Sequence, residues 1–224
     1  MGIWGSQNLM FSLIVFDLDG TLIDSRRDIA DAANTVLRAS GAPPLSDDAI
    51  GRMVGEGAAT LVARAFSAGG LPPPPDALAQ FLDAYGRCLL VHTRPYPGIL
   101  DVLDTLVRRV PLALLTNKPL AATHEILSAL DLARFFPSAS VLGGDGPLPR
   151  KPAPDGLRHL AAHACVDVAS TVLVGDSLVD WRTARAAGAR ACLARYGFGF
   201  VTFPVERLTP EDRLVDDTAG LLAL

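Results

Sequence analysis

Short apolar runs recur along this sequence, and each one stops at a turn rich in glycine or polar residues. Runs of this length are typical of strands that are buried on both faces of a parallel sheet. Segments with the spacing of amphipathic helices lie between them, so the pattern predicts an α/β protein with a Rossmann-like, doubly wound parallel sheet as its core. The predicted strands are residues 12–16, 112–115, 139–142, 171–174 and 191–194. The predicted core helices are residues 99–107, 122–132, 155–164 and 180–187, the last of them ended by Gly188.

The first two predicted strands are too far apart in the sequence for a single crossover helix. Helical patterns fill most of the interval, and no convincing strand appears among them; a run of four prolines separates two of the helices. We therefore expect an inserted all-α cap. The helical patterns cover residues 27–39, 58–68 and 76–90. The predicted core comprises residues 1–25 and 95–224, and the predicted cap comprises residues 26–94.

The composition excludes several classes of function. The chain has 224 residues, half of them hydrophobic, and 24 acidic against 20 basic side chains give a net charge of −4. Because no lysine- or arginine-rich run occurs either, we expect no binding to nucleic acid. The apolar runs are far too short to cross a bilayer, so we expect no membrane span. Three scattered cysteines without metal spacing fit a reducing compartment, and we expect a cytoplasmic protein.

The first ten residues carry no charged side chain, and the apolar run that follows them stops at Asp17. This is not the pattern of a secretory signal peptide, which has a basic start and a longer apolar stretch. The first six residues match a short myristoylation pattern, but no basic segment or second acylation signal supports it. We expect a loose leader.

Arginine is the usual cation of this chain, because only two of its 20 basic residues are lysine. These two are Lys118 and Lys151. Lysine differs from arginine in presenting a compact ammonium on a flexible stem. We therefore expect both lysines at positions where that group is specifically needed.

Carboxylates gather where two of the predicted strands end. Asp17 and Asp19 follow the first strand, and Asp176 and Asp180 lie one helical turn apart after the fourth. Ligand sites of doubly wound sheets lie beyond the carboxyl ends of the strands, so we expect these side chains to face one crevice. A single aspartate there is more typical of a helix cap or a turn. Several together repel one another unless a hard cation neutralises them, and oxygen ligands without a His/Cys cluster point to Mg²⁺.

Four segments together resemble the signatures of the haloacid dehalogenase-like (HAD) hydrolase superfamily. They occur in order, the resemblance extends from Leu13 over the rest of the chain, and the helical insert is similar to the helical cap of that superfamily. Among its members the chain most resembles phosphoglycolate phosphatases and their close relatives. The four segments are Asp17-Leu18-Asp19-Gly20-Thr21, Leu115-Thr116-Asn117-Lys118, Arg150-Lys151-Pro152 and Gly175-Asp176-Ser177-Leu178-Val179-Asp180.

The resemblance implies Mg²⁺-dependent hydrolysis of a small phosphomonoester through a phosphoaspartyl intermediate. Asp17 would be the nucleophile, Asp19 the general acid and base, and Lys151 a catalytic cation. Mg²⁺ would bind the Asp17 carboxylate, the Asp19 backbone carbonyl and Asp176. Asp180 would orient the metal-bound water or Lys151. The phosphate-binding positions would be Gly20, Thr21, Thr116 and Asn117.

Substrate choice is expected to depend on the cap. Gly55 and Gly57 would either bring the cap backbone against the substrate or only form a turn between helices. Arg52 or Arg64 would meet a second anionic group of the substrate. Asp19 and the lysine-free cap argue against the dehalogenases and the phosphonate-cleaving members of the superfamily.

Some alternatives are left open by the sequence. A sugar phosphomutase of the same fold and a non-catalytic, phosphate-binding member are the two alternative functions. Lys118 has either a structural role, in a cap or salt bridge, or a direct one. The physiological substrate and the oligomeric state, monomer or homodimer, are also open.

Overall fold

The computed structural model describes residues 11–224, so the predicted leader lies outside the described residues. The core is a six-stranded sheet with the order β5-β4-β1-β6-β7-β8, and every neighbouring pair is parallel. The predicted doubly wound sheet is thereby confirmed. The strands are β1 (Leu13–Phe16), β4 (Leu112–Leu115), β5 (Val141–Leu142), β6 (Thr171–Gly175), β7 (Arg190–Ala194) and β8 (Arg213–Val215). The pattern did not predict the edge strand β8, because two of its three residues are exposed.

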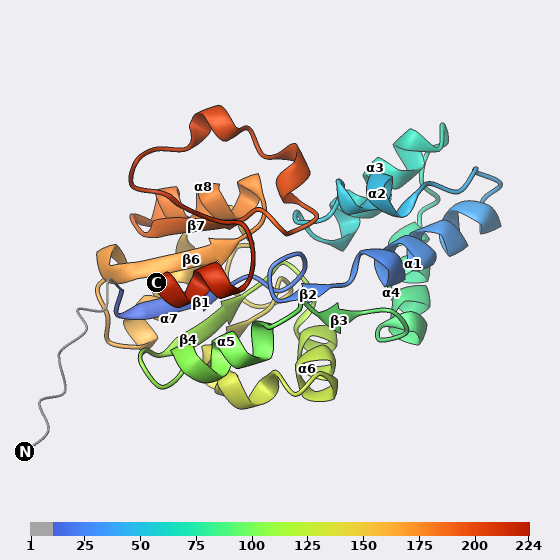
Figure 1. Cartoon of the computed structure of the whole chain (residues 1–224). Coiled ribbons are helices and arrows are strands. Elements are labelled where there is room, and N and C mark those ends of the chain that lie inside the picture. Colours follow the sequence, from blue (N-terminus) through green and yellow to red (C-terminus); the bar gives the residue numbers. More distant parts are fainter. Residues whose placement is uncertain (1–10) are drawn as a thin grey trace, which may run out of the picture.

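The side chains of β1 alternate between two hydrophobic cores. Ile14 and Phe16 pack in one core with helices α5 and α6, and Leu13 and Val15 pack in the other with α7 and α8. Both faces of the sheet are therefore covered by helices (Figure 1). These helices are α5 (Ile99–Leu106), α6 (Leu120–Ala129), α7 (Asp155–His163) and α8 (Leu178–Ala187). Gly188 follows α8 in the left-handed conformation, at φ +84°, and ends it as predicted.

Four further helices gather to one side of the sheet, away from the core helices (Figure 1). They are α1 (Arg26–Ala39), α2 (Asp47–Gly51), α3 (Ala58–Ala68) and α4 (Ala77–Cys88). The chain enters and leaves this cap through two short antiparallel strands, β2 (Ile23–Asp24) and β3 (Arg94–Pro95). The expectation of no strand in this interval is wrong, because a two-residue strand is too short to show alternation in the sequence. The domain limits at residues 26 and 94 stay a prediction.

A buried carboxylate holds the segment that returns from the cap. Asp28 of α1 is fully buried. It accepts hydrogen bonds of 2.7–3.0 Å from the backbone N–H groups of His92 and Thr93 and from the Thr93 hydroxyl. The start of the first cap helix is thereby fixed to the segment leading into β3, which positions the cap over the core.

The remaining helical turns are short. No helix within residues 11–224 combines the length and the apolar character that crossing a bilayer requires. The 3₁₀ helices are Ala133–Phe135, Ser138–Ser140, Val168–Ser170, Phe200–Thr202, Val205–Arg207 and Ala219–Ala223.

Candidate active site

Polar side chains from three strand ends meet at the carboxyl edge of the sheet, beneath the cap. Strands β4, β1 and β6 are neighbours in parallel register, so the residues that follow them emerge side by side. Asp17 and Asp19 follow β1, and Asp176 follows β6. The residues that follow β4 are Thr116, Asn117 and Lys118.

Three buried carboxylates share the floor of this site with one ammonium. Oxygen atoms of Asp17, Asp176 and Asp180 all lie within 4.8 Å of one another. The Lys151 ammonium is 2.8 Å from Asp17 Oδ1 and 2.6 Å from Asp180 Oδ1. With all three carboxylates ionised, one positive charge would face three negative charges, and the cluster would carry excess negative charge.

Asp180 uses both of its oxygens within the protein. Its Oδ1 binds Lys151, while its Oδ2 accepts hydrogen bonds from the backbone N–H and the hydroxyl of Ser177, at 3.1 and 2.6 Å. With Ser177 it forms the capping box that begins α8. Asp180 is thus fixed by the helix start and in turn holds Lys151 beside Asp17.

Asp176 lies in a space that only glycine neighbours leave open. A Cβ on Gly20 would stand 1.9 Å from Asp176 Oδ2, and Gly20 has φ +84°. A Cβ on Gly197 would stand 2.3 Å from Asp176 Cβ, and the Gly199 N–H donates to Asp176 Oδ2 at 2.7 Å. Sequence reasoning missed Gly197 and Gly199. Their signal is the pair of glycines in the segment 195–199, which follows the last predicted strand.

Asp19 makes a separate ion pair with the second lysine. The Lys118 ammonium lies 2.8 and 2.9 Å from the two Asp19 oxygens, and the Ser25 hydroxyl also donates to Asp19 Oδ1. The ammonium is 4.7 Å from the centroid of the Tyr85 ring, on cap helix α4. Burial alone would lower the pKa of Lys118, but Asp19 and then Tyr85 raise it above its ordinary value, so Lys118 stays charged. Ser25 and Tyr85 are further contacts that sequence reasoning did not single out.

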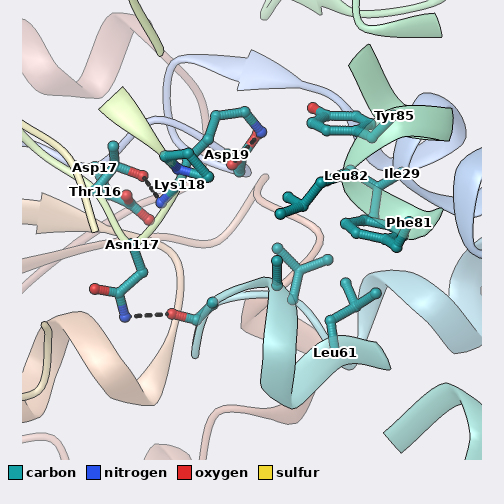
Figure 2. Close-up of a pocket in the computed structure, with 15 residues that line it drawn as sticks. Asp17, Asp19, Ile29, Leu61, Phe81, Leu82, Tyr85, Thr116, Asn117 and Lys118 are labelled. Atoms are coloured by element: carbon teal, nitrogen blue, oxygen red, sulfur yellow. Dashed lines mark hydrogen bonds and ion pairs between the residues drawn. The ribbon is translucent and has the colours of Figure 1, made fainter. Parts of the chain in front are cut away.

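A small cavity of about 60 Å³ lies between the core and the cap. Figure 2 shows the polar side chains of the core on one side of it and apolar side chains of the cap on the other. Gly55 and Gly57 also line the cavity, whereas Gly20 and Thr21 do not. The core wall consists of Asp17, Asp19, Thr116, Asn117, Lys118 and Pro119. The cap wall includes Ile29, Val54, Ala58, Leu61, Phe81, Leu82 and Tyr85.

Comparison of the sequence with known protein families agrees with this arrangement of the site. A family model described as haloacid dehalogenase-like hydrolase matches residues 11–188. The chain belongs to this family. Its four signature segments supply the carboxylates, the lysines and the Thr116–Asn117 pair of the site.

Relatives of this HAD hydrolase include several bacterial proteins named phosphoglycolate phosphatase. The chain is 41% identical over 194 residues to one from Rhodospirillum rubrum, covering 83% of this chain and 80% of the relative. A plasmid-encoded one from Cupriavidus necator is 37% identical over 225 residues, covering 97% and 94%. Among solved structures, one described as a predicted phosphoglycolate phosphatase from Haemophilus somnus 129pt has a TM-score of 0.88 at 29% identity, covering 96% and 98%.

Asn117 connects cap and core in this HAD hydrolase. Its side-chain amide donates to the Gly55 carbonyl of the cap and to the Lys151 carbonyl, both at 2.8 Å. Both amide protons are therefore used within the protein, which leaves the side chain no donor for a phosphate oxygen.

Thr21 is fully buried, and its carbonyl accepts a hydrogen bond from the Tyr196 hydroxyl. Its place is in the turn after β1 and not at the cavity wall.

The carboxylate cluster fits a hard divalent cation. Burial raises the pKa of Asp17 to about 6, because Lys151 offsets only part of the cost of burial and Asp180 adds repulsion. Burial, followed by repulsion from Asp180 and Asp17, raises the pKa of Asp176 well above its ordinary value. A cation placed among these oxygens would remove the repulsion, and carboxylate oxygens are the ligands that Mg²⁺ prefers.

The metal-free protein is expected to lose stability as the pH rises from about 5 to about 7.5. The folded-state pKa of Asp17 is raised, so its contribution is complete below the unfolded value near 3.8 and is lost as the pH passes about 6. One pKa unit corresponds to about 1.4 kcal/mol, and about 1 kcal/mol shifts Tm by ~2–4 °C for a chain of this size.

Thermal unfolding at both pH values, with EDTA and with Mg²⁺, measures this effect. We expect Tm in EDTA to be lower at the higher pH, and Mg²⁺ to raise Tm more at the higher pH, where it does not compete with protons. Asp17→Asn should reduce the pH dependence and leave the part that the raised pKa of Asp176 contributes. A stabilisation by Mg²⁺ that is equal at both pH values would contradict the prediction.

Proposed function

We propose that this HAD hydrolase is an Mg²⁺-dependent phosphatase that hydrolyses a small phosphomonoester through an aspartyl-phosphate intermediate. The observation that carries the proposal is the buried cluster of Asp17, Asp176 and Asp180 with Lys151, in which Asp17 reaches the cavity wall beside Asp19. Phosphoglycolate is the substrate to test first, because several relatives bear the name of that activity.

The chemistry divides into two displacements at phosphorus. An Asp17 oxygen attacks the phosphorus, the bond from phosphorus to the ester oxygen breaks, and Asp19 gives a proton to that oxygen as the alcohol leaves. Asp19 then takes a proton from a water molecule, which attacks the phosphorus and returns the Asp17 carboxylate and inorganic phosphate. Asp17 and Asp19 both line the cavity, so both can reach one bound phosphate.

The negative charge of the phosphoryl group must be balanced beside the carboxylates. Mg²⁺, bound by the Asp17 and Asp176 carboxylates and the Asp19 carbonyl, would neutralise the phosphoryl oxygens and hold them against the nucleophile. Lys151 adds a second positive charge at Asp17. The Thr116 hydroxyl accepts from the Lys118 backbone N–H at 3.2 Å, so its own proton is available for a phosphoryl oxygen. The Asn117 backbone N–H is the second donor that we assign to the phosphate.

The lining of the cavity does not favour the alternative functions. A sugar phosphomutase must bind a second phosphate, but among the residues that line this cavity in residues 11–224 Lys118 is the only cation. A non-catalytic member would be expected to lack Asp17 or Asp19, and both are present. We place the enzyme in the cytoplasm, in agreement with three free cysteines among the described residues.

Phosphate release from a panel of phosphomonoesters tests the proposal. The panel contains 2-phosphoglycolate, 2-hydroxyethyl phosphate, glycerol phosphate, hexose phosphates and p-nitrophenyl phosphate. We expect release with Mg²⁺, loss of release with EDTA, and recovery when Mg²⁺ is added in excess. Failure to release phosphate from every substrate, by folded protein that binds Mg²⁺, would overturn the proposal.

A further inference from the structure

One buried hydroxyl in the cavity has no acceptor for its proton among the described residues. Tyr85 is 5% exposed and lines the cavity from cap helix α4, with its ring stacked on Phe81 at a centroid distance of 5.8 Å. Among the described residues its hydroxyl has no acceptor for its proton, and the polar group beside it is the Lys118 ammonium, which can only donate. Burial raises the pKa of Tyr85 to about 12, so the hydroxyl keeps its proton. A buried polar group without a partner is costly, which makes this hydroxyl a candidate contact for a ligand.

The neighbour of this hydroxyl is the Lys118 ammonium. Figure 2 shows the hydroxyl end of Tyr85 directed towards Lys118 and Asp19. The ammonium can only donate hydrogen bonds, and it gives two N–H groups to the Asp19 oxygens, so it offers no acceptor to the Tyr85 proton. An O–H donor and an ammonium thus lie side by side in a wall that is otherwise apolar on the cap side.

We propose that Tyr85 and Lys118 form a subsite for an anionic group, a carboxylate, on the leaving portion of the substrate. One carboxylate oxygen would accept from the Tyr85 hydroxyl, and the ammonium would neutralise the charge. This inference rests on the proposed phosphatase function and assigns the residues that would recognise a carboxylate of the substrate. The cavity of about 60 Å³ suits a short carboxylate-bearing phosphomonoester.

The arginines of the cap do not offer a competing subsite. Arg64 binds Glu56 at 2.6 Å, and neither Arg64 nor Arg52 lines the cavity. The two subsite residues come from opposite sides, Tyr85 from the cap and Lys118 from the core. The subsite is therefore complete only when the cap lies against the core, and a bound carboxylate would stabilise that closed arrangement.

Tyr85→Phe tests this subsite, because it removes the hydroxyl and keeps the ring. We expect kcat/KM for 2-phosphoglycolate to fall by about 10- to 100-fold, and kcat/KM for 2-hydroxyethyl phosphate, which lacks the carboxylate, to fall by less than about threefold. Lys118→Met should also lower the ratio of kcat/KM for 2-phosphoglycolate to kcat/KM for 2-hydroxyethyl phosphate. Tyr96→Phe is the matched control, because Tyr96 does not line the cavity and the ratio should not change.

Equal losses on both substrates in Tyr85→Phe would overturn the subsite, and so would a wild-type enzyme without preference for 2-phosphoglycolate. A binding measurement separates this failure from that of the phosphatase proposal. In an Asp17→Asn background, which cannot turn over, calorimetry with 2-phosphoglycolate should show at least about tenfold weaker binding when Tyr85→Phe is added. Unchanged binding would overturn the subsite, whatever the activity panel shows.

Discussion

Replacement of Asp17 by asparagine is expected to lower kcat by about 10,000-fold or more on every phosphomonoester. The amide cannot serve as the nucleophile, and no other carboxylate can replace it. Both Asp180 oxygens are engaged by Lys151 and Ser177, and Asp19 is held by Lys118 and Ser25. Wild-type enzyme quenched in acid during turnover should carry a phosphoryl group that hydroxylamine removes. The variant should carry none.

The same variant is expected to be folded, and in EDTA at neutral pH it should unfold at a higher temperature than the wild type. Burial and like charges raise the pKa of Asp17 to about 6, so its ionised form destabilises the metal-free protein. The neutral amide removes this repulsion, and a gain of about 1 kcal/mol would raise Tm by ~2–4 °C. Asp101→Asn, at an exposed aspartate of α5, is the matched control for both activity and Tm. Residual turnover within about tenfold of wild type would contradict the role of Asp17.

The core of this molecule could be predicted because its signals are local. Each buried strand is a continuous apolar run, and the polar residues that follow it must emerge at the same edge of the sheet. The rarity of lysine added a second signal, since both lysines of the chain lie buried in ion pairs with aspartates of the site. The short strands β2 and β3 gave no such signal, because their pairing depends on the cap helices that bring them together.

The contacts that complete the site could not be predicted because they depend on tertiary packing. Tyr85 occupies an ordinary apolar position in the sequence of its helix, and its importance comes from Lys118, which is far away in the chain. Gly199 acts through a single N–H group that reaches Asp176 from the loop after β7. Asn117 was expected to bind phosphate, but its side-chain amide donates to the carbonyl groups of Gly55 and Lys151.

The two walls of the cavity differ in the groups that they carry. The core wall carries Asp17 and Asp19, which the reaction needs for any phosphomonoester, whereas the cap wall is apolar except for the Tyr85 hydroxyl. Variants of Asp17, and of Lys151 that contacts it, should therefore change the rate on all substrates together. Variants of the proposed subsite, Tyr85 and Lys118, should change the ratio between substrates.

Lys151→Met is expected to lower the rate on all substrates together. Its effect on kcat should be second only to that of Asp17→Asn. Its ammonium is the only cation within the buried carboxylate cluster of the described structure, 2.8 Å from Asp17 and 2.6 Å from Asp180. Without it, the phosphoryl group would approach Asp17 with less charge neutralised, and we expect kcat to fall by about 1,000-fold. The kcat values for 2-phosphoglycolate and for 2-hydroxyethyl phosphate should fall in the same proportion.

The variant should also be less stable, by about 3–5 kcal/mol in EDTA at neutral pH, because removal of one partner leaves buried charges uncompensated. Protonation of the remaining carboxylates relieves this, so urea unfolding at about pH 5 should show a smaller loss than at about pH 7.5. Arg182→Met, at an exposed cation of α8, is the matched control and should change stability by no more than about 0.5 kcal/mol.

If added Mg²⁺ restored stability and turnover together, Lys151 would act only by balancing charge in the folded protein. Restored stability without restored turnover is the expected result, since it separates the structural effect of the ammonium from its effect on the transferring phosphoryl group.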